Sequence, residues 1–116
     1  MRLRIAVLVC MLTATPFPAL RAEEAATDGA VLFRRTCVMC HGPDGRADTP
    51  MGRRSGVKDL TASVLGDEQI RETIQHGARN AKGAMPAYGA KFSPAELDAL
   101  VGFVRSLRPA QNAAKP

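Results

Sequence analysis

The sequence feature that most constrains the fold is a C-x-x-C-H pentapeptide formed by Cys37, Cys40 and His41. On a helical turn, residues three and four apart fall on one side, so two thiols and an imidazole can meet the same flat object. Haem uses all three groups, because its vinyl groups form thioethers and its iron binds an imidazole. The pattern is typical of c-type haem attachment. It therefore predicts one covalently bound haem c, attached to the two cysteines with its iron on His41.

Three other interpretations of the pentapeptide are weaker. A thioredoxin-like redox centre requires a βαβ context, which the sequence does not offer. A zinc site requires a fourth ligand, usually from a second Cys or His pair, whereas His76 and Cys10 are the only such residues left. A structural disulfide would leave His41 unexplained. The sequence therefore favours haem.

The N-terminal segment has the pattern of a secretory signal peptide. Arg2 and Arg4 precede an apolar run over residues 5–12, and a bilayer span would take about 20 apolar residues. We expect residues 1–22 to be removed on export to the periplasm, leaving no stable membrane insertion. An uncleaved anchor, or a lipid anchor on Cys10, is the weaker alternative.

Cysteine usage and charge agree with an exported haem protein. After this cleavage Cys37 and Cys40 are the only cysteines, and haem attachment uses both. The net charge of +5 includes three arginines that leave with residues 1–22. So weak a basic balance gives no support for nucleic-acid binding. The pairs Arg34-Arg35 and Arg53-Arg54 are most simply solvated surface.

The remaining chain shows helical periodicity and no alternating strand pattern, which predicts an all-α domain. The first predicted helix runs to residue 36, with Asp28 as its N-cap, and leads into the haem motif. Gly29, Phe33 and Cys37 share one face of it. Because glycine destabilises a helix relative to alanine, Gly29 indicates that another backbone packs closely there.

Two more helices are predicted further along. One covers residues 67–75, with Asp67 as its cap. The other begins with a capping box at Ser93 and ends before Pro109. The segments between them are rich in glycine and proline, which predicts irregular loops over 42–58 and 77–92 and a flexible tail over 110–116. The apolar residues left for the wall of a haem pocket are Val57, Leu60 and Val64.

The iron face opposite His41 requires a second ligand or stays open to exogenous ligands. Met39 lies inside the pentapeptide and cannot cross the ring. Met85 is followed by a proline and has small neighbours, which lets the chain lie near a porphyrin. Met85 is therefore the preferred sixth ligand, with Met51 and His76 as weaker alternatives.

With these motifs the chain resembles the class I cytochromes c, in particular small bacterial mono-haem carriers. The resemblance covers nearly all of residues 23–109 and rests on CVMCHG at 37–42, GAMPAY at 83–88 and the final helix SPAELDALVGFVRSL. It implies a cytochrome c fold, with three to five helices wrapped around one covalent haem. It also implies that Gly29 and Phe33 cross the C-terminal helix at Leu100 and Phe103.

The resemblance assigns roles at the haem as well. It implies that His41 is the proximal ligand and Met85 the distal ligand. Arg79 and Lys82, which are close to Met85 in sequence, are candidates for holding the haem propionates. The family's proline that orients the proximal imidazole through its carbonyl has two candidates here, Pro43 and Pro50.

These features together predict a soluble periplasmic carrier that cycles one electron between ferric and ferrous iron. We expect no enzymatic activity, because Asp59, Asp67 and Glu96 are explained as caps and turn residues. The expected partners are a donor dehydrogenase or cytochrome complex and an acceptor oxidase or reductase, with the chain a monomer or a subunit of a redox complex. Two alternatives remain: a cytochrome subunit of a larger dehydrogenase or oxidase complex, and a haem-based ligand sensor in which Met85 is displaceable.

Overall fold

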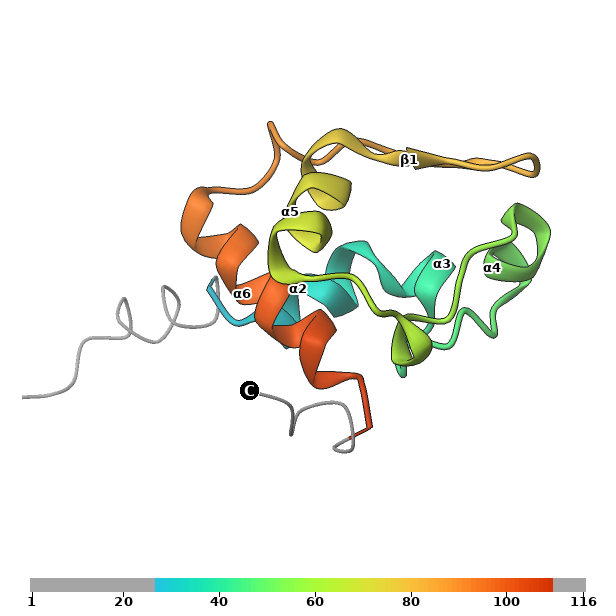
Figure 1. The fold of residues 1–116 in the computed structure, drawn as a ribbon, viewed down its shortest axis with the longest axis horizontal. Coiled ribbons are helices and arrows are strands. Elements are labelled where there is room, and N and C mark those ends of the chain that lie inside the picture. The colour runs from blue at the N-terminus through green and yellow to red at the C-terminus, as the bar shows by residue number, and fades with distance from the viewer. Residues whose placement is uncertain (1–26, 110–116) are drawn as a thin grey trace, which may run out of the picture.

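The computed structural model describes residues 27–109 (Figure 1). The predicted signal peptide over 1–22 and tail over 110–116 lie outside the described residues. Within the described part there are five α-helices, one short 3-10 helix and one two-stranded hairpin. The elements follow the order α2 (Gly29–Thr36), α3 (Val38–His41), α4 (Pro50–Ser55), η1 (Leu60–Ala62), α5 (Asp67–His76), β1 (Ala78–Arg79), β2 (Ala84–Met85) and α6 (Pro94–Ser106).

Helices α2 and α6 cross closely, and this crossing forms the centre of the core (Figure 1). A Cβ atom on Gly29 would lie 2.1 Å from the carbonyl oxygen of Ala99, so only glycine permits the approach. The rings of Phe33 and Phe103 pack with their centroids 5.0 Å apart. The prediction of a second backbone beside Gly29 is therefore confirmed, with Ala99 as the residue it meets. The largest fully buried side chains are Phe33 and Leu100.

Helix α5 packs against α6 and is fixed to it by ion pairs. The Arg105 guanidinium donates to the Asp67 carboxylate at 2.9 Å, and Arg71 pairs with Asp98. The expectation that Asp67 caps α5 is wrong. The cap is Gly66, whose backbone N–H donates to the side chain of Gln69, and Asp67 is the first helical residue. Because the Asp67 carboxylate does not cap α5, it can pair with Arg105 on α6.

The caps predicted for the first and last helices are confirmed. Asp28 accepts hydrogen bonds from the backbone of Ala30 and Val31 at the start of α2. Ser93 and Glu96 form a reciprocal capping box at the start of α6.

Neither stretch predicted as irregular is wholly so. The segment 42–58 contains α4, which Thr49 caps by accepting from Gly52 N–H. The Thr49 hydroxyl also donates to the carbonyl of Met39 on α3. The segment 77–92 contains the hairpin, in which Ala78 pairs with Met85.

The structure thus confirms a mostly helical domain with the expected number of helices. The hairpin extends as an arm beyond the helices, over α4 (Figure 1). No helix within residues 27–109 has the length and apolar character needed to cross a membrane.

Candidate haem-binding site

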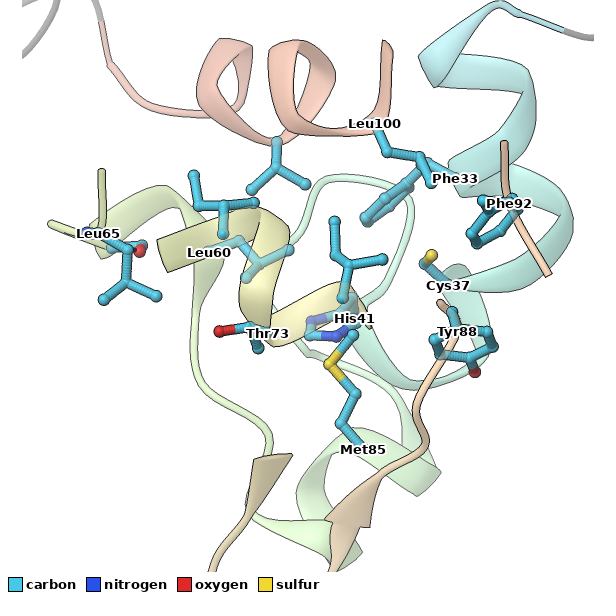
Figure 2. A pocket seen from close by; sticks show the side chains of 14 residues that line it. Phe33, Cys37, His41, Leu60, Leu65, Thr73, Met85, Tyr88, Phe92 and Leu100 are labelled. Carbon is cyan, nitrogen blue, oxygen red and sulfur yellow. Dashed lines mark hydrogen bonds between the residues drawn. The ribbon is translucent and has the colours of Figure 1, made fainter. Parts of the chain in front are cut away.

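An open cavity of about 590 Å³ lies among the helices, and its walls are mainly apolar (Figure 2). Helices α5 and α6 form one part of the wall, and the α2–α3 junction, η1 with the chain that follows it, and the segment from β2 onward form the rest. The lining residues are Phe33, Cys37, His41, Leu60, Ser63, Leu65, Ile70, Thr73, Ile74, Met85, Tyr88, Phe92, Leu100 and Val104.

The pentapeptide forms the turn that brings its side chains to this cavity. Cys37 ends α2 and begins α3, and its carbonyl accepts the backbone N–H of His41 at 2.9 Å. This places Cys37 and His41 on the same side of the turn, and both line the cavity. Cys40 is half-buried on the same short helix but is not among the lining residues. Neither cysteine is in a disulfide.

Burial controls the charge of the two lining groups. Burial lowers the pKa of the His41 imidazole, which keeps the ring neutral and a nitrogen lone pair available. The same effect raises the pKa of the Cys37 thiol to about 11.

The His41 ring is held by packing, and its Nδ1 atom has no acceptor. The ring centroids of Phe33 and His41 lie 6.3 Å apart. Nδ1 is buried and makes no hydrogen bond. Within the described residues, neither Pro43 nor Pro50 therefore provides the carbonyl expected to orient the imidazole.

Met85 also lines the cavity. It is half-buried on β2, and Figure 2 shows its side chain directed toward the His41 ring. Gly77 makes this position possible, because a Cβ atom there would lie 2.5 Å from the Met85 carbonyl oxygen. The structure thus brings together a neutral imidazole and a thioether, which come from residues far apart in the sequence.

The other candidate ligands do not line the cavity. Met39 is 72% exposed and Met51 is 36% exposed, and His76 is also exposed at the end of α5. Arg79 and Lys82, the predicted propionate residues, lie exposed on the hairpin and do not line the cavity either.

The predicted pocket wall needs correction. Leu60 lines the cavity as expected, but Val64 is 91% exposed and Val57 does not line it. The next residue, Leu65, lines the cavity instead, with 37% of its surface exposed. The alternation of Val64 and Leu65 follows the extended chain between η1 and α5, which the sequence pattern did not reveal.

Sequence reasoning also missed several lining residues. Thr73 lies three residues after Ile70 on the same face of α5, so helical spacing could have identified it. Tyr88 and Phe92 follow β2 and were assigned to a loop. Backbone hydrogen bonds from Tyr88 to Ile74 at 2.9 Å and from Gly89 to Gln75 at 3.1 Å bring that segment back to α5.

The residues present fit a covalent haem. Such a group requires reactive thiols on one turn, an available imidazole nitrogen, and apolar walls with a second donor. Cys37 and Cys40 supply the thiols, His41 the nitrogen and Met85 a sulfur donor. No group of three or more His, Cys, Asp or Glu side chains in residues 27–109 could hold a metal ion directly.

Comparison with protein families gives a match over most of the chain. The model described as cytochrome c oxidase, cbb3-type, subunit III matches residues 24–104. The cbb3-type cytochrome c oxidase subunit FixP of Azorhizobium caulinodans is 36% identical over 87 residues, which cover 72% of this chain and 27% of FixP. The chain therefore spans about a quarter of the length of this relative.

Shorter relatives match over most of their own length. Cytochrome c6 of Bryopsis maxima is 33% identical over 76 residues, which cover 66% of this chain and 84% of the relative. The solved structure of the KustC0563 c-type cytochrome superimposes with a TM-score of 0.61 at 30% identity. This superposition covers 71% of the present chain and 99% of that one.

Proposed function

The chain belongs to the c-type cytochrome family described as cytochrome c oxidase, cbb3-type, subunit III, and from that membership we propose a periplasmic electron carrier with His41 and Met85 as axial iron ligands. Members of this family bind covalently attached haem c and carry electrons. The main observation in support of this proposal is that His41, Met85 and Cys37 line the same apolar cavity.

Each residue has a defined part in this proposal. Cys37 and Cys40 would hold the cofactor as thioethers, and the imidazole of His41 and the thioether of Met85 would bind its iron. With both residues bound, no iron position would remain for a substrate. When bound, the haem supplies a one-electron couple between ferric and ferrous iron, and a methionine ligand raises its potential. The surrounding apolar side chains exclude water and hold both ligands in place, so little reorganisation accompanies electron transfer.

A specific finding favours a second candidate within the same chemistry. Both the family model and FixP carry names of an oxidase subunit, which supports a role as the cytochrome component of a larger redox complex. The match of cytochrome c6 over most of its own length supports a free carrier instead. The apparent mass of the protein purified from its native membranes and periplasm distinguishes the two candidates. A single small species supports the free carrier, and co-purification with oxidase or dehydrogenase subunits supports the complex.

The axial ligands are tested by replacing Met85 with alanine in the holoprotein. We expect the unmodified protein to show sharp reduced c-type bands and the weak far-red band of sulfur bound to ferric iron. Met85→Ala should lose the far-red band and bind carbon monoxide when reduced. Met51→Ala is the matched control, because Met51 does not line the cavity and should leave both properties unchanged.

Three outcomes would contradict the proposal. A far-red band that persists in Met85→Ala and disappears in Met51→Ala would move the ligand to α4. Rapid carbon monoxide binding by the unmodified protein would indicate a ligand sensor. Absence of covalent haem, after expression with the maturation machinery, would remove the whole assignment.

A further inference from the structure

A cationic residue, Arg108, follows the cavity-lining helix α6 in the sequence. Leu100 and Val104 line the cavity, and Arg108 follows Val104 by four residues. Helix α6 ends at Ser106. Beyond it, the backbone N–H of Leu107 donates to the Val104 carbonyl and that of Arg108 donates to the Arg105 carbonyl, each at 3.2 Å, which is the bonding of a tight 3-10-type turn. Arg108 therefore lies in the turn that follows the cavity-lining helix and does not itself line the cavity.

The guanidinium of Arg108 lacks an anion. Its Nη2 donates to the carbonyl of Leu65, but Nε is buried and has no partner. No carboxylate within residues 27–109 pairs with it, whereas Arg46, Arg53 and Arg105 each pair with one and Arg71 pairs with two. The other described arginines without an ion pair are exposed, namely Arg34, Arg35, Arg54 and Arg79. A half-buried cation without a counter-charge is costly, and such groups in proteins are normally paired.

The neighbours of Arg108 place it at the rim of the haem cavity. Leu65, which it holds, lines the cavity. Ser63 also lines the cavity. Its Oγ accepts the N–H of Leu65 at 3.3 Å, which leaves its hydroxyl hydrogen free to donate.

This rim lies opposite the side where the thioethers form. Figure 2 shows Leu65 and Thr73 across the cavity from Cys37 and Tyr88. On the porphyrin ring, the vinyl groups that react with cysteines and the two propionates occupy opposite edges. Attachment at Cys37 therefore directs the propionates toward Leu65, where Arg108 and Ser63 are.

We propose that Arg108 is the principal anchor of a haem propionate, with the Ser63 hydroxyl as a second donor. This inference depends on the haem binding proposed above. It replaces the hairpin residues Arg79 and Lys82 as the main candidates. None of the three lines the cavity, but Arg79 and Lys82 are exposed, whereas Arg108 is half-buried, has a buried Nε without a partner and contacts the lining residue Leu65. The cofactor brings the carboxylate that Arg108 lacks.

Other charged groups around this rim already have partners. Asp59, before η1, accepts from the backbone and hydroxyl of Thr61, and these bonds lower its pKa. Asp67 on α5 pairs with Arg105. A change in the titration of the propionate can therefore be traced to Arg108.

The test is the pH dependence of the midpoint potential of Arg108→Gln holoprotein. An adjacent guanidinium lowers a carboxyl pKa by about 1–3 units. Its removal should raise the pKa of the propionate by about 1 unit or more. The rise in potential on acidification, caused by protonation of the propionate, should then begin at correspondingly higher pH. Arg108→Lys keeps the charge and should restore most of the original profile.

Arg105→Gln is the matched control, because it removes the same charge three residues earlier, in the last turn of α6. Its partner is Asp67, so its pH profile should coincide with that of the unmodified protein. Visible spectra of each variant, recorded first, show whether haem and both axial ligands are retained. A protein without haem contradicts the proposed function, whereas intact spectra with an unchanged pH profile contradict only the role of Arg108.

If Arg108→Gln does not incorporate haem, a measurement on the unmodified holoprotein can test the contact between Arg108 and the propionate independently. Proton NMR should show nuclear Overhauser contacts between the Arg108 side chain and propionate methylene protons. Contacts from Arg79 or Lys82, with none from Arg108, would overturn the proposal. The same conclusion would follow if Arg79→Gln or Lys82→Gln reproduced the shifted pH profile.

Discussion

At the scale of single residues, Gly77 decides where Met85 lies. Its φ of 77° belongs to the left-handed region that favours glycine. It ends α5, and the next residue, Ala78, pairs directly with Met85. The close approach of Gly77 to the Met85 carbonyl leaves no room for a side chain. One glycine thus ends a helix and sets the position of the proposed distal ligand.

Gly77→Ala is expected to lower the free energy of unfolding by about 1–2 kcal/mol from backbone strain alone. The contact with the Met85 carbonyl adds to this loss, and displacement of Met85 should weaken the far-red band. Denaturant unfolding and near-infrared absorption of the holoprotein measure the two effects. Gly102→Ala is the control, since nothing lies within 4 Å of its Cβ position. It should stabilise α6 by up to about 1 kcal/mol. An equal effect of the two substitutions would show that Gly77 has no special role.

At the scale of elements, local signals explain why some helices were predicted and others were not. Helix α6 carries its capping box and apolar periodicity within its own sequence, so it can be recognised without knowledge of the fold. Helix α4 has six residues and depends on Thr49, whose hydroxyl bonds to Met39 on α3. A contact of this kind cannot be inferred from local pattern.

The hairpin also depends on contacts with a distant element. The side-chain amide of Asn80 donates to the carbonyls of Ser55 and Gly56 at the end of α4, at 3.0 and 3.1 Å. Its carbonyl oxygen accepts from the backbone of Lys82 and Gly83 in the hairpin turn. Two-residue strands have little intrinsic stability, so the glycine-rich segment acquires its pairing from α4.

The crossing of α2 and α6 gives a prediction at this scale. Gly29→Ala should improve the intrinsic helix propensity of α2 but force its Cβ into the Ala99 carbonyl. Overpacking of this kind costs about 1–3 kcal/mol, and contact with backbone rather than a flexible side chain favours the upper part of that range. The midpoint of denaturant unfolding should fall, with the axial ligands retained. A midpoint equal to or above that of the unmodified protein would show that the helices separate without cost.

At the scale of the whole molecule, the cavity occupies the place where a larger domain would have its core. Within residues 27–109 the largest fully buried side chains are Phe33 and Leu100. Small domains with so little buried volume usually require a covalent or metal-dependent staple. A haem attached at Cys37 and Cys40 would fill the cavity and connect α3, α5, α6 and the hairpin.

Replacing both Cys37 and Cys40 with alanine is therefore expected to abolish cooperative unfolding. The protein should keep part of its helical far-ultraviolet signal while it loses near-ultraviolet structure and binds hydrophobic dyes. Circular dichroism during heating measures the transition. Met39→Ala, in the same pentapeptide, is the control, because its side chain is exposed and should leave the transition unchanged. A sharp transition in the double variant at the temperature of the holoprotein would show that the core is sufficient by itself.

The family, the cofactor and the helices with complete local signals can be predicted from the amino-acid sequence. Cys37, Cys40 and His41 lie within one turn, so the haem-attachment motif is recognisable without tertiary information. Three properties become visible only in the folded molecule: which residues line the cavity, that Leu65 lines it while Val64 faces solvent, and that Arg108 lacks an anion. These properties depend on contacts between segments far apart in the chain, which the periodicity within one segment does not predict.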